Sequence, residues 1–366
     1  MHTVLVLGGY GYFGTIISRL LARHSDLRVL IGGRNLQRAH QCAEALGKST
    51  VSGVQIDYTS SNFVHELLQL KVDTVIHTAG PFQGQNYSVA QHCIKARCHY
   101  IDIADSRAFV SGIYQLDKYA LAKNVLVASG ASSVPSLAAA VVDHFLPEFS
   151  RLDEIRHGIS AGSKTPGLAT IQGVLGYCGQ PFRRYENGNW RIVHGWQGLH
   201  KRHFPSPIGK QWMGNCDVPD LELFPHRYPS VHTVTFHAGL EIATSHLATW
   251  GLSWLARGRL VGNAARFGRR LKTLSEKMEQ RGQGNSAMHI ELNGLDQAGR
   301  PYNRAWHLVA RNGHGIHIPC AVASLLARKL ALGEISKRGA TPCLDLFALY
   351  EYLHELRDLD IAQHVE

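Results

Sequence analysis

The chain has 366 residues, of which 45% are hydrophobic, and a formal net charge of +10. Its length exceeds that of one typical hydrophobic core and suits two domains of a globular protein. The excess of lysine and arginine favours anionic ligands, but these residues are spread along the chain. Because the sequence has neither a basic stripe with stacking aromatic residues nor a known reading motif, we expect no nucleic-acid partner.

The cysteines and the opening residues indicate the cellular environment. The seven cysteines include no Cys-x-x-Cys pair, which predicts reduced thiols in a cytoplasmic protein. The opening residues MHTVLVLGG lack a basic region and a cleavage site, so they predict a β-strand rather than a signal peptide. No uncharged apolar run is long enough to span a membrane, and we expect no stable insertion.

Short apolar runs alternate with amphipathic stretches through the first third of the chain. Runs rich in Val, Ile and Leu are typical of parallel strands that are covered on both faces, and the stretches between them carry apolar residues at helical spacing. The expected strands are TVLVLGG, LRVLIGG, GVQIDY, DTVIHTAG, CHYIDIAD and NVLVASG. This alternation predicts an α/β fold with a Rossmann-type, doubly wound parallel sheet.

The pattern changes near Ser133. The segments LDEIRHGISAG, RYENGNWRIVHGW, VHTVTFHAG and MHIELNGLDQAGRPYNRAWHLVA predict a second, α+β domain with a mixed, mostly antiparallel sheet. NGNW and DQAGR have the composition of hairpin turns. Two helical segments, PCAVASLLARKLALG and CLDLFALYEYLHELRDL, close the chain. We expect a first domain of residues 1–132 with 318–366, and a second domain of residues 133–317.

A glycine pattern follows the first expected strand. Gly9, Gly11 and Gly14 have the spacing G-x-G-x-x-G and open a helix that begins near Phe13. In this context the pattern is the dinucleotide-binding fingerprint: Gly9 forms the tight turn, Gly11 lets a pyrophosphate approach the backbone, and Gly14 lets helix and strand pack closely. The first helical N–H groups, around Tyr12 and Phe13, attract the anion. The alternative is a tight turn without a ligand.

The end of the second expected strand selects the nucleotide. An NAD site usually has Asp or Glu there to hold the ribose 2′-OH, whereas this chain has Gly33, Arg34 and Asn35. A guanidinium can bind a 2′-phosphate through two hydrogen bonds, and a carboxylate would repel that phosphate. The sequence therefore predicts NADP(H) as the cofactor. The alternative is that Arg34 is a solvent-exposed residue at a helix start.

Two further strand ends are expected to contact the cofactor, because ligands of such sheets bind outside the carboxyl ends of the strands. Asp57, after the third strand, is a hydrogen-bond partner for the adenine amino group. After the fourth strand, small residues leave room for the nicotinamide ribose, and Pro81 and Phe82 would border the ring. The expected contacts at this end are Thr78, Ala79, Gly80 and Pro81. A structural role is the alternative for each of them.

These features together resemble the saccharopine dehydrogenase-like, NADP-binding oxidoreductases. GGYGYFG, GGRN, DTVIHTAGPF and HYIDIAD carry the resemblance, while GWQGL, CDVPDLELFPHRYP and AWHLVARNGHG look similar to a bacterial subgroup of unknown substrate. The resemblance implies a Rossmann domain and a mixed-sheet domain that holds a small-molecule substrate and mediates dimerisation. It also implies that the final helices pack back on the first domain.

Proton transfer is the chemistry that the protein must add, since the nicotinamide itself carries the hydride. Asp102 shares one side of the fifth strand with Tyr100 and is a candidate base or ligand for a substrate amine. Asp105 is more simply explained as a helix cap. Lys164, in a loop before a helix, would bind a carboxylate or phosphate, and His314 is a candidate acid or base. An exposed loop lysine and a histidine without chemistry are the alternatives.

The segment LATWGLSWLARGRLVGNAARFGRRLK, from Leu247, combines Trp, Leu and Phe with basic residues as an interfacial helix does. Packing against the other domain or a dimer partner explains the same pattern, and peripheral membrane contact is the alternative. No spacing of His, Cys and carboxylate residues predicts a metal site.

The sequence thus predicts an NADP(H)-dependent oxidoreductase that transfers hydride to or from a C=N or C=O bond of a small carboxylate-bearing substrate. Two alternatives stay open. One is a non-catalytic NADP(H)-binding sensor or scaffold. The other is an enoyl-type partner reductase that acts on a lipid or carrier-bound substrate.

Overall fold

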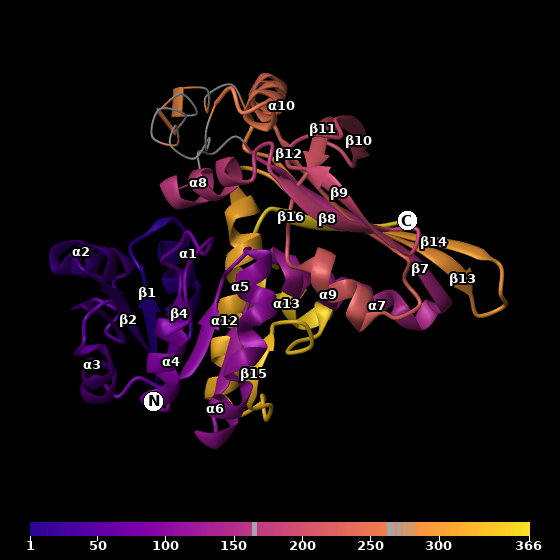
Figure 1. The fold of residues 1–366 in the computed structure, drawn as a ribbon. Coiled ribbons are helices and arrows are strands. Elements are labelled where there is room, and N and C mark those ends of the chain that lie inside the picture. Colours follow the sequence, from indigo (N-terminus) through magenta and orange to yellow (C-terminus); the bar gives the residue numbers. More distant parts are fainter. Residues whose placement is uncertain (163–166, 262–267, 269–271, 274–275, 278, 280–281) are drawn as a thin grey trace. The chain divides into compact units, whose positions relative to one another are not determined.

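The computed structural model describes residues 1–162, 167–261, 268, 272–273, 276–277, 279 and 282–366. They divide into two compact units (Figure 1). The first unit comprises Met1–Leu137 and Ile316–Glu355, and the second comprises Ala138–Gly315 and Leu356–Glu366. Each unit is built on its own sheet.

The first unit contains a seven-stranded sheet in the order β15-β6-β5-β4-β1-β2-β3, with every neighbouring pair parallel. Strand β1 lies inside the sheet between β4 and β2, and from Val4 to Leu7 its residues are at most 1% exposed. The predicted Rossmann-type sheet is confirmed, but its seventh strand, β15, was not predicted. The strands are β1 (His2–Leu7), β2 (Leu27–Gly33), β3 (Val51–Gln55), β4 (Thr74–His77), β5 (His99–Asp102), β6 (Leu126–Ser129) and β15 (Gly339–Pro342).

Helices connect these strands, and their ends have local causes. Helix α2 begins where the Asn35 side chain accepts a hydrogen bond from the Arg38 N–H at 3.0 Å, and ends at Gly47 with φ 61°. The helices of the first unit before residue 138 are α1 (Tyr12–Leu21), α2 (Leu36–Leu46), α3 (Phe63–Gln69), α4 (Ser88–Lys95), α5 (Arg107–Ser111), η1 (Gly112–Leu116), α6 (Asp117–Ala122) and η2 (Ser133–Leu137).

Two C-terminal helices, α12 (His317–Ala331) and α13 (Leu349–Glu355), belong to the first unit. Helix α12 is largely buried, and its Cys320 thiol lies 3.8 Å from the carbonyl oxygen of Phe13 in α1. Tyr352 of α13 donates a hydrogen bond to the Ile318 carbonyl oxygen at 2.9 Å. The predicted packing of the final helices on the Rossmann sheet is therefore confirmed. The last residues differ, because Leu356–Glu366 belong to the second unit.

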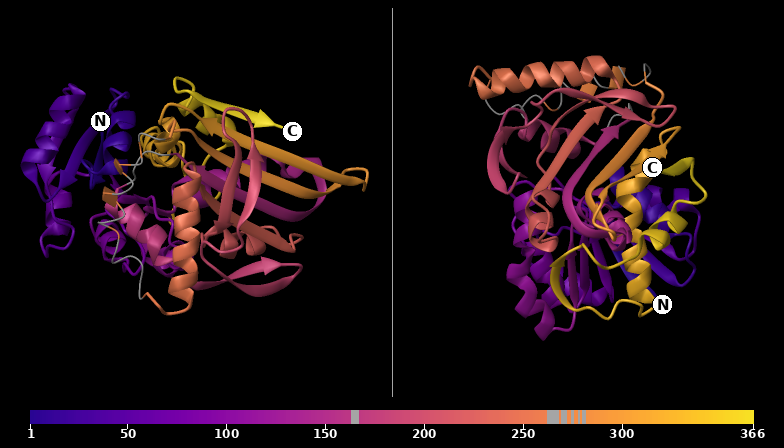
Figure 2. Two further views of the ribbon diagram at one scale, coloured as in Figure 1. Left: turned by 90° about the horizontal axis from the view of Figure 1, so that it is seen from above. Right: turned by 90° about the vertical axis from the view of Figure 1, so that its right-hand side faces the viewer.

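The second unit contains a nine-stranded mixed sheet in the order β10-β11-β12-β7-β13-β14-β16, to which β8 and β9 are attached through β12 (Figure 2). Among the described residues β12 and β7 form its one parallel pair, so the predicted mixed sheet is confirmed. The strands are β7 (Phe149–Ala161), β8 (Pro181–Glu186), β9 (Asn189–His194), β10 (His200–Phe204), β11 (Gly209–Asn215), β12 (Thr233–Leu240), β13 (Ser286–Asp296), β14 (Pro301–Ala310) and β16 (Ile361–Val365).

The two predicted hairpin turns are present in this sheet. Asn187 and Gly188 join β8 to β9 with φ of 51° and 74°, and Gly299, with φ 76°, lies between β13 and β14. The helices with described bounds in the second unit are α7 (Ala138–Phe145), η3 (Leu146–Glu148), α8 (Leu168–Gly176), α9 (Asp220–Arg227) and α10 (Ala243–Arg257), and η6 (His314–Ile316) lies where this unit ends.

A row of histidines crosses the second sheet on one face. The strand registers place His237, Gly158, His289, His307 and His364 opposite one another on β12, β7, β13, β14 and β16. A Cβ on Gly158 would lie 2.4 Å from the His237 carbonyl oxygen and 2.7 Å from the His289 ring, so no side chain fits between the two neighbouring histidines. Burial holds the pKa of His237 and of His289 well below the usual value for histidine. These two rings are therefore neutral at pH 7.

Candidate cofactor-binding site

The turn between β1 and α1 leaves no room for a side chain at Gly9 or Gly14. A Cβ on Gly14 would lie 2.1 Å from the Gly8 carbonyl oxygen, and a Cβ on Gly9 would lie 2.9 Å from the Ile31 side chain of β2. The left-handed position is Gly8, with φ 78°. The predicted close packing at Gly14 is thus present, but the tight turn is made by Gly8, and Gly9 is small because it faces β2.

The N-terminus of α1 offers backbone donors rather than a side-chain cap. Gly11 is the N-cap residue, is exposed, and has no side chain that could bond the first helical N–H groups. Tyr12 and Phe13 are half-buried and form the first turn, with their ring centroids 5.2 Å apart. A glycine cradle followed by an uncapped helix N-terminus suits a pyrophosphate, so this turn fits the cofactor that the sequence predicts.

The Tyr10 side chain packs across the end of β2. A Cβ on Gly33 would lie 2.4 Å from the Tyr10 ring, so Gly33 is small because the ring crosses it. The Tyr10 hydroxyl accepts a hydrogen bond from the Asn35 N–H at 3.1 Å. The Arg38 guanidinium lies 4.8 Å from the centroid of the same ring.

Two exposed arginines lie close to this strand end in the chain, Arg34 directly after β2 and Arg38 in the first turn of α2. Arg34 was predicted at this site and Arg38 was not. The sequence does carry a signal for Arg38, because it lies in the first turn of the helix that follows this strand end.

Asp57 lies after β3, at the same edge of the sheet. Its Oδ1 accepts hydrogen bonds from the Thr59 N–H at 3.0 Å and from the Thr59 hydroxyl at 2.8 Å. These bonds, with a smaller effect of the Arg34 charge, hold the pKa of the Asp57 carboxyl below its usual value. An ionised acceptor beside Arg34 is consistent with the predicted adenine contact.

Hydrogen bonds within the first unit hold the loop after β4 in place. Thr78 donates its hydroxyl to the Leu7 carbonyl oxygen at 2.7 Å, which ties the loop to β1. Gln85 donates its amide to the carbonyl oxygens of Ala79 and Pro81 at 3.0 and 2.8 Å, holding the two residues on either side of Gly80.

Phe82 follows this loop and is 5% exposed. Its ring packs on the rings of His77 and Phe109, with centroids 5.2 and 5.4 Å away. The ring is thus mostly buried within the first unit, and its contact with the nicotinamide stays a prediction.

Asp102 at the end of β5 is completely buried. Its Oδ1 accepts hydrogen bonds from the Gly130 N–H at 2.8 Å, the Ala104 N–H at 3.0 Å and the Ser129 hydroxyl at 3.0 Å. Burial raises the pKa of this carboxyl to about 6, and the same hydrogen bonds oppose the shift. Asp102 thus joins the ends of β5 and β6. The carboxylate has no exposed surface in this structure, and its predicted role in proton transfer stays a prediction.

A buried histidine that the sequence analysis did not select lies on the neighbouring strand. His77 ends β4, is 1% exposed, and its Nδ1 lies 3.0 Å from the Tyr100 hydroxyl of β5. Burial lowers the pKa of His77 to about 4. His77, Tyr100 and Asp102 are therefore buried polar residues in the neighbouring strands β4 and β5.

The other two predicted catalytic residues belong to the second part of the chain. Lys164 lies outside the described residues. His314 is half-buried, and its Nδ1 accepts a hydrogen bond from the Asp360 N–H at 2.8 Å. A neutral His314 ring consequently carries its proton on Nε2.

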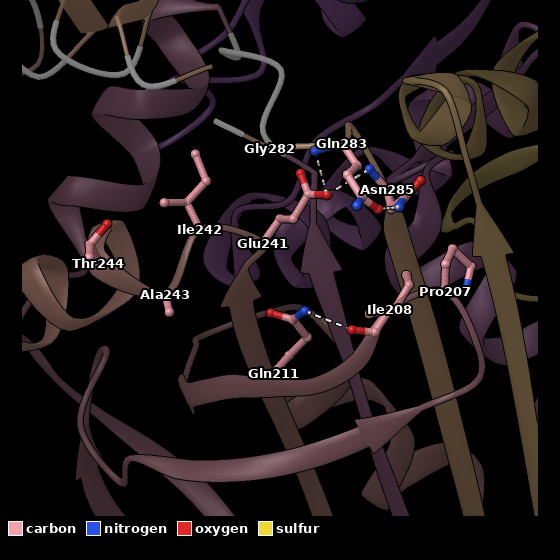
Figure 3. Close-up of a pocket in the computed structure, with 10 residues that line it drawn as sticks. All are labelled: Pro207, Ile208, Gln211, Glu241, Ile242, Ala243, Thr244, Gly282, Gln283 and Asn285. Carbon is pink, nitrogen blue, oxygen red and sulfur yellow. Dashed lines mark hydrogen bonds between the residues drawn. The ribbon is translucent and has the colours of Figure 1, made fainter. Parts of the chain in front are cut away.

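The second unit also contains a pocket of about 430 Å³ beside the start of α10 (Figure 3). The Glu241 carboxylate there accepts hydrogen bonds from the N–H groups of Gln283, Gly284 and Asn285, each at 3.1 Å. The Glu241 carboxylate thus fixes the backbone of residues 283–285, directly before β13 begins. Among the described residues, no group of three or more His, Cys, Asp or Glu side chains is arranged to bind a metal ion.

Comparison with known proteins identifies the first domain. Residues 4–130 match the family model of the saccharopine dehydrogenase NADP binding domain. No curated protein sequence matches the chain. The structure of apo saccharopine dehydrogenase (L-Glu forming) from Saccharomyces cerevisiae aligns over 100% of both chains with a TM-score of 0.69 and 12% identity. A substituted meso-DAP dehydrogenase with DAP, from Clostridium tetani E88, aligns over 98% of this chain and 99% of its own with a TM-score of 0.47 and 13% identity. The yeast similarity shows a shared fold.

Proposed function

Residues 4–130 form an NADP-binding domain of the saccharopine dehydrogenase family, and from this premise we propose that the protein is an NADP(H)-dependent oxidoreductase. It transfers hydride to or from a C=N or C=O bond of a small, carboxylate-bearing substrate. The nicotinamide supplies the hydride chemistry when it is bound, and the protein binds, orients and exchanges a proton.

The observation that carries this proposal is the end of β2. Tyr10 lies across Gly33, and the exposed guanidiniums of Arg34 and Arg38 are both available to an anion beside that ring. The residues that directly follow β2 include no carboxylate that would hold a ribose 2′-OH and repel a 2′-phosphate. Two cations at this position favour NADP(H) over NAD(H).

The first test is a titration of the protein with NADPH and with NADH, followed by nicotinamide fluorescence. Arg34→Ala and Arg38→Ala should each weaken NADPH binding by roughly ten- to a hundredfold, since each removes a charge-assisted contact of about 1.5–3 kcal/mol. NADH binding should change little in either variant. Arg23→Ala, an exposed arginine after the other end of α1, is the matched control. Equal affinity of the native protein for both nucleotides would overturn the cofactor preference.

The reaction is tested by NADPH consumption with imines formed from 2-oxo acids and amines. We propose His314 as the group that exchanges the proton, because its imidazole is half-buried and is oriented by the hydrogen bond from the Asp360 N–H to Nδ1. We propose Lys164 as the cation for the substrate carboxylate. His314→Ala should lose turnover while NADPH binding is unchanged, and His314→Gln should not restore turnover, because glutamine cannot exchange a proton. Tight NADPH binding without turnover on any substrate class would instead favour the non-catalytic sensor or scaffold.

A further inference from the structure

The fully buried residues of helix α10 are polar or small, with Leu252 packed beside them on an apolar cluster, whereas its outer face carries large exposed apolar side chains. His246 and Ser253 are completely buried, and Ala256 is 7% exposed on the same side. The opposite side carries Trp254, 49% exposed, and Leu255, 45% exposed. A helix at the surface of a globular protein normally has the reverse arrangement, with its apolar side inward.

The inner face of α10 packs closely against Gly179 and Trp196. A Cβ on Gly179 would lie 2.3 Å from the Ser253 carbonyl oxygen, so the helix backbone rests directly on this glycine. The His246 ring lies 5.5 Å from that of Trp196, which is 2% exposed. The polar inner face is therefore the packed one, and turning the helix to bury Trp254 would break these contacts.

The charged residues in this part of the chain begin at the end of α10 and continue after it. Apart from the histidine at 246, no titratable side chain occurs from Ala243 to Ala256. The first charges, Arg257 and Arg259, are exposed, and the Arg257 guanidinium lies 5.3 Å from the Trp254 ring. The sequence that continues from them to residue 281 is mostly basic among its charges, with lysine or arginine at 266, 269, 270, 272, 277 and 281 and glutamate at 276 and 279.

We propose that α10 docks on an anionic lipid surface. Its outer side chains, with Leu247 and with Leu260, which is 76% exposed, would enter the boundary between head groups and acyl chains. Tryptophan suits that boundary because its ring is apolar and its N–H is polar. Arg257 and Arg259 would remain at the level of the lipid phosphates, and basic residues near such a surface add electrostatic attraction. Among the described residues, no helix is both long and apolar enough to cross a membrane, so the contact is peripheral.

A second copy of this chain is the less suitable occupant of the same face. A twofold contact places the same patch on both sides of the interface. Since no Asp or Glu occurs from Ala243 to Leu260, Arg257 and Arg259 would find no carboxylate on the α10 of a second copy. An anionic bilayer satisfies the apolar and the basic parts of the patch together.

The test is co-sedimentation of the full-length protein with vesicles of phosphatidylcholine alone and of equal parts phosphatidylcholine and phosphatidylserine. Binding should require phosphatidylserine and should weaken as salt is added. Trp254→Ser combined with Leu255→Ser should lower the affinity about tenfold or more, since two exposed apolar groups are removed. Trp254→Phe should retain most binding. Leu121→Ser, at a residue of α6 that is 53% exposed, is the matched control and should bind normally.

Three results would overturn the proposal: no binding to anionic vesicles, equal binding to neutral ones, or equal loss in the Leu121 control. A self-associating native protein that becomes monomeric in the double variant, without vesicle binding, would assign the face to a second copy instead. NADPH affinity, measured on the same samples, should be unchanged in the double variant. The test is therefore independent of the proposed oxidoreductase function.

Discussion

At the scale of single residues, the turn between β1 and α1 requires glycines because it has no room for a Cβ atom. Gly14 has no room for a methyl group, because a Cβ would lie 2.1 Å from the Gly8 carbonyl oxygen and 2.7 Å from the Gly9 Cα. Both contacts are with backbone, which cannot rotate away as a flexible side chain would. The start of α1 and the end of β1 consequently hold each other in one geometry.

Gly14→Ala should therefore lower stability by roughly 1–3 kcal/mol and weaken NADPH binding, since α1 must move away from the turn. Thermal unfolding and the nicotinamide titration measure the two effects. Gly176→Ala is the control, because nothing lies within 4 Å of the added Cβ at the end of α8. A Gly14→Ala variant as stable as the native protein would show that the turn is looser than described.

Asp102 provides a second residue-scale prediction. Asp102→Asn keeps an oxygen acceptor for the N–H groups of Ala104 and Gly130 and removes a buried charge, so the melting temperature at pH 7 should not fall. Asp102→Ala leaves those buried donors unpaired and should cost about 2–5 kcal/mol. If Asp102→Asn folds normally but loses all turnover at every pH, a purely structural role is contradicted and the predicted role of Asp102 in proton transfer is supported.

At the scale of elements, β16 closes one edge of the second sheet. It pairs with β14 from Trp306↔Val365 to Ala310↔Ile361, and the Ala305 and Glu366 backbones exchange hydrogen bonds of 2.9 and 2.8 Å. The same chain end is held by His314, which accepts the Asp360 N–H. The strand therefore covers an edge that would otherwise present unpaired backbone groups beside the buried Trp306.

Removing residues 361–366 should destabilise the second unit and increase aggregation, because the β14 edge is exposed. Light scattering on heating and urea unfolding report the two effects. Gln363→Ala keeps the backbone ladder and serves as the control. The first unit should retain NADPH binding in the truncated protein, and a loss of that binding would show that the two units do not fold separately.

At the scale of the whole molecule, buried neutral histidines set the response to acid. Burial lowers the pKa of His77 and of His246 to about 4, from 6.5. The unfolded chain then binds more protons than the native chain between these values, so stability falls as pH falls from 6.5 towards 4. Asp102 works in the opposite direction, because its pKa of about 6 lets the native state take up a proton first.

The midpoint of urea unfolding should therefore decrease on going from pH 7 to pH 5. His77→Gln should make this decrease shallower, since one of the neutral histidines is removed, by an amount on the order of 1 kcal/mol at the lower pH. His226→Gln, whose side chain is 78% exposed, should leave the slope unchanged. An identical slope in the native and His77→Gln proteins would mean that His77 titrates normally in the folded state.

The sequence by itself determined the fold class and the position of the cofactor turn. Strand–helix alternation and the spacing of Gly9, Gly11 and Gly14 depend on neighbouring residues, and local pattern records such information directly. The same holds for Arg34, whose place at a strand end follows from chain order. Strand β15 escaped prediction because four residues, Gly339–Pro342, are recognisable as a strand only beside β6.

Only the tertiary structure decided what the individual side chains do. Asp102 is a buried link between strand ends because the end of β6 reaches it from the next strand. The Arg38 guanidinium lies against the Tyr10 ring, and α10 turns Trp254 outward because Gly179 contacts the other face. In each case the deciding contact comes from a residue distant in sequence or on another element. Period and spacing carry no record of such contacts, since they describe one segment at a time.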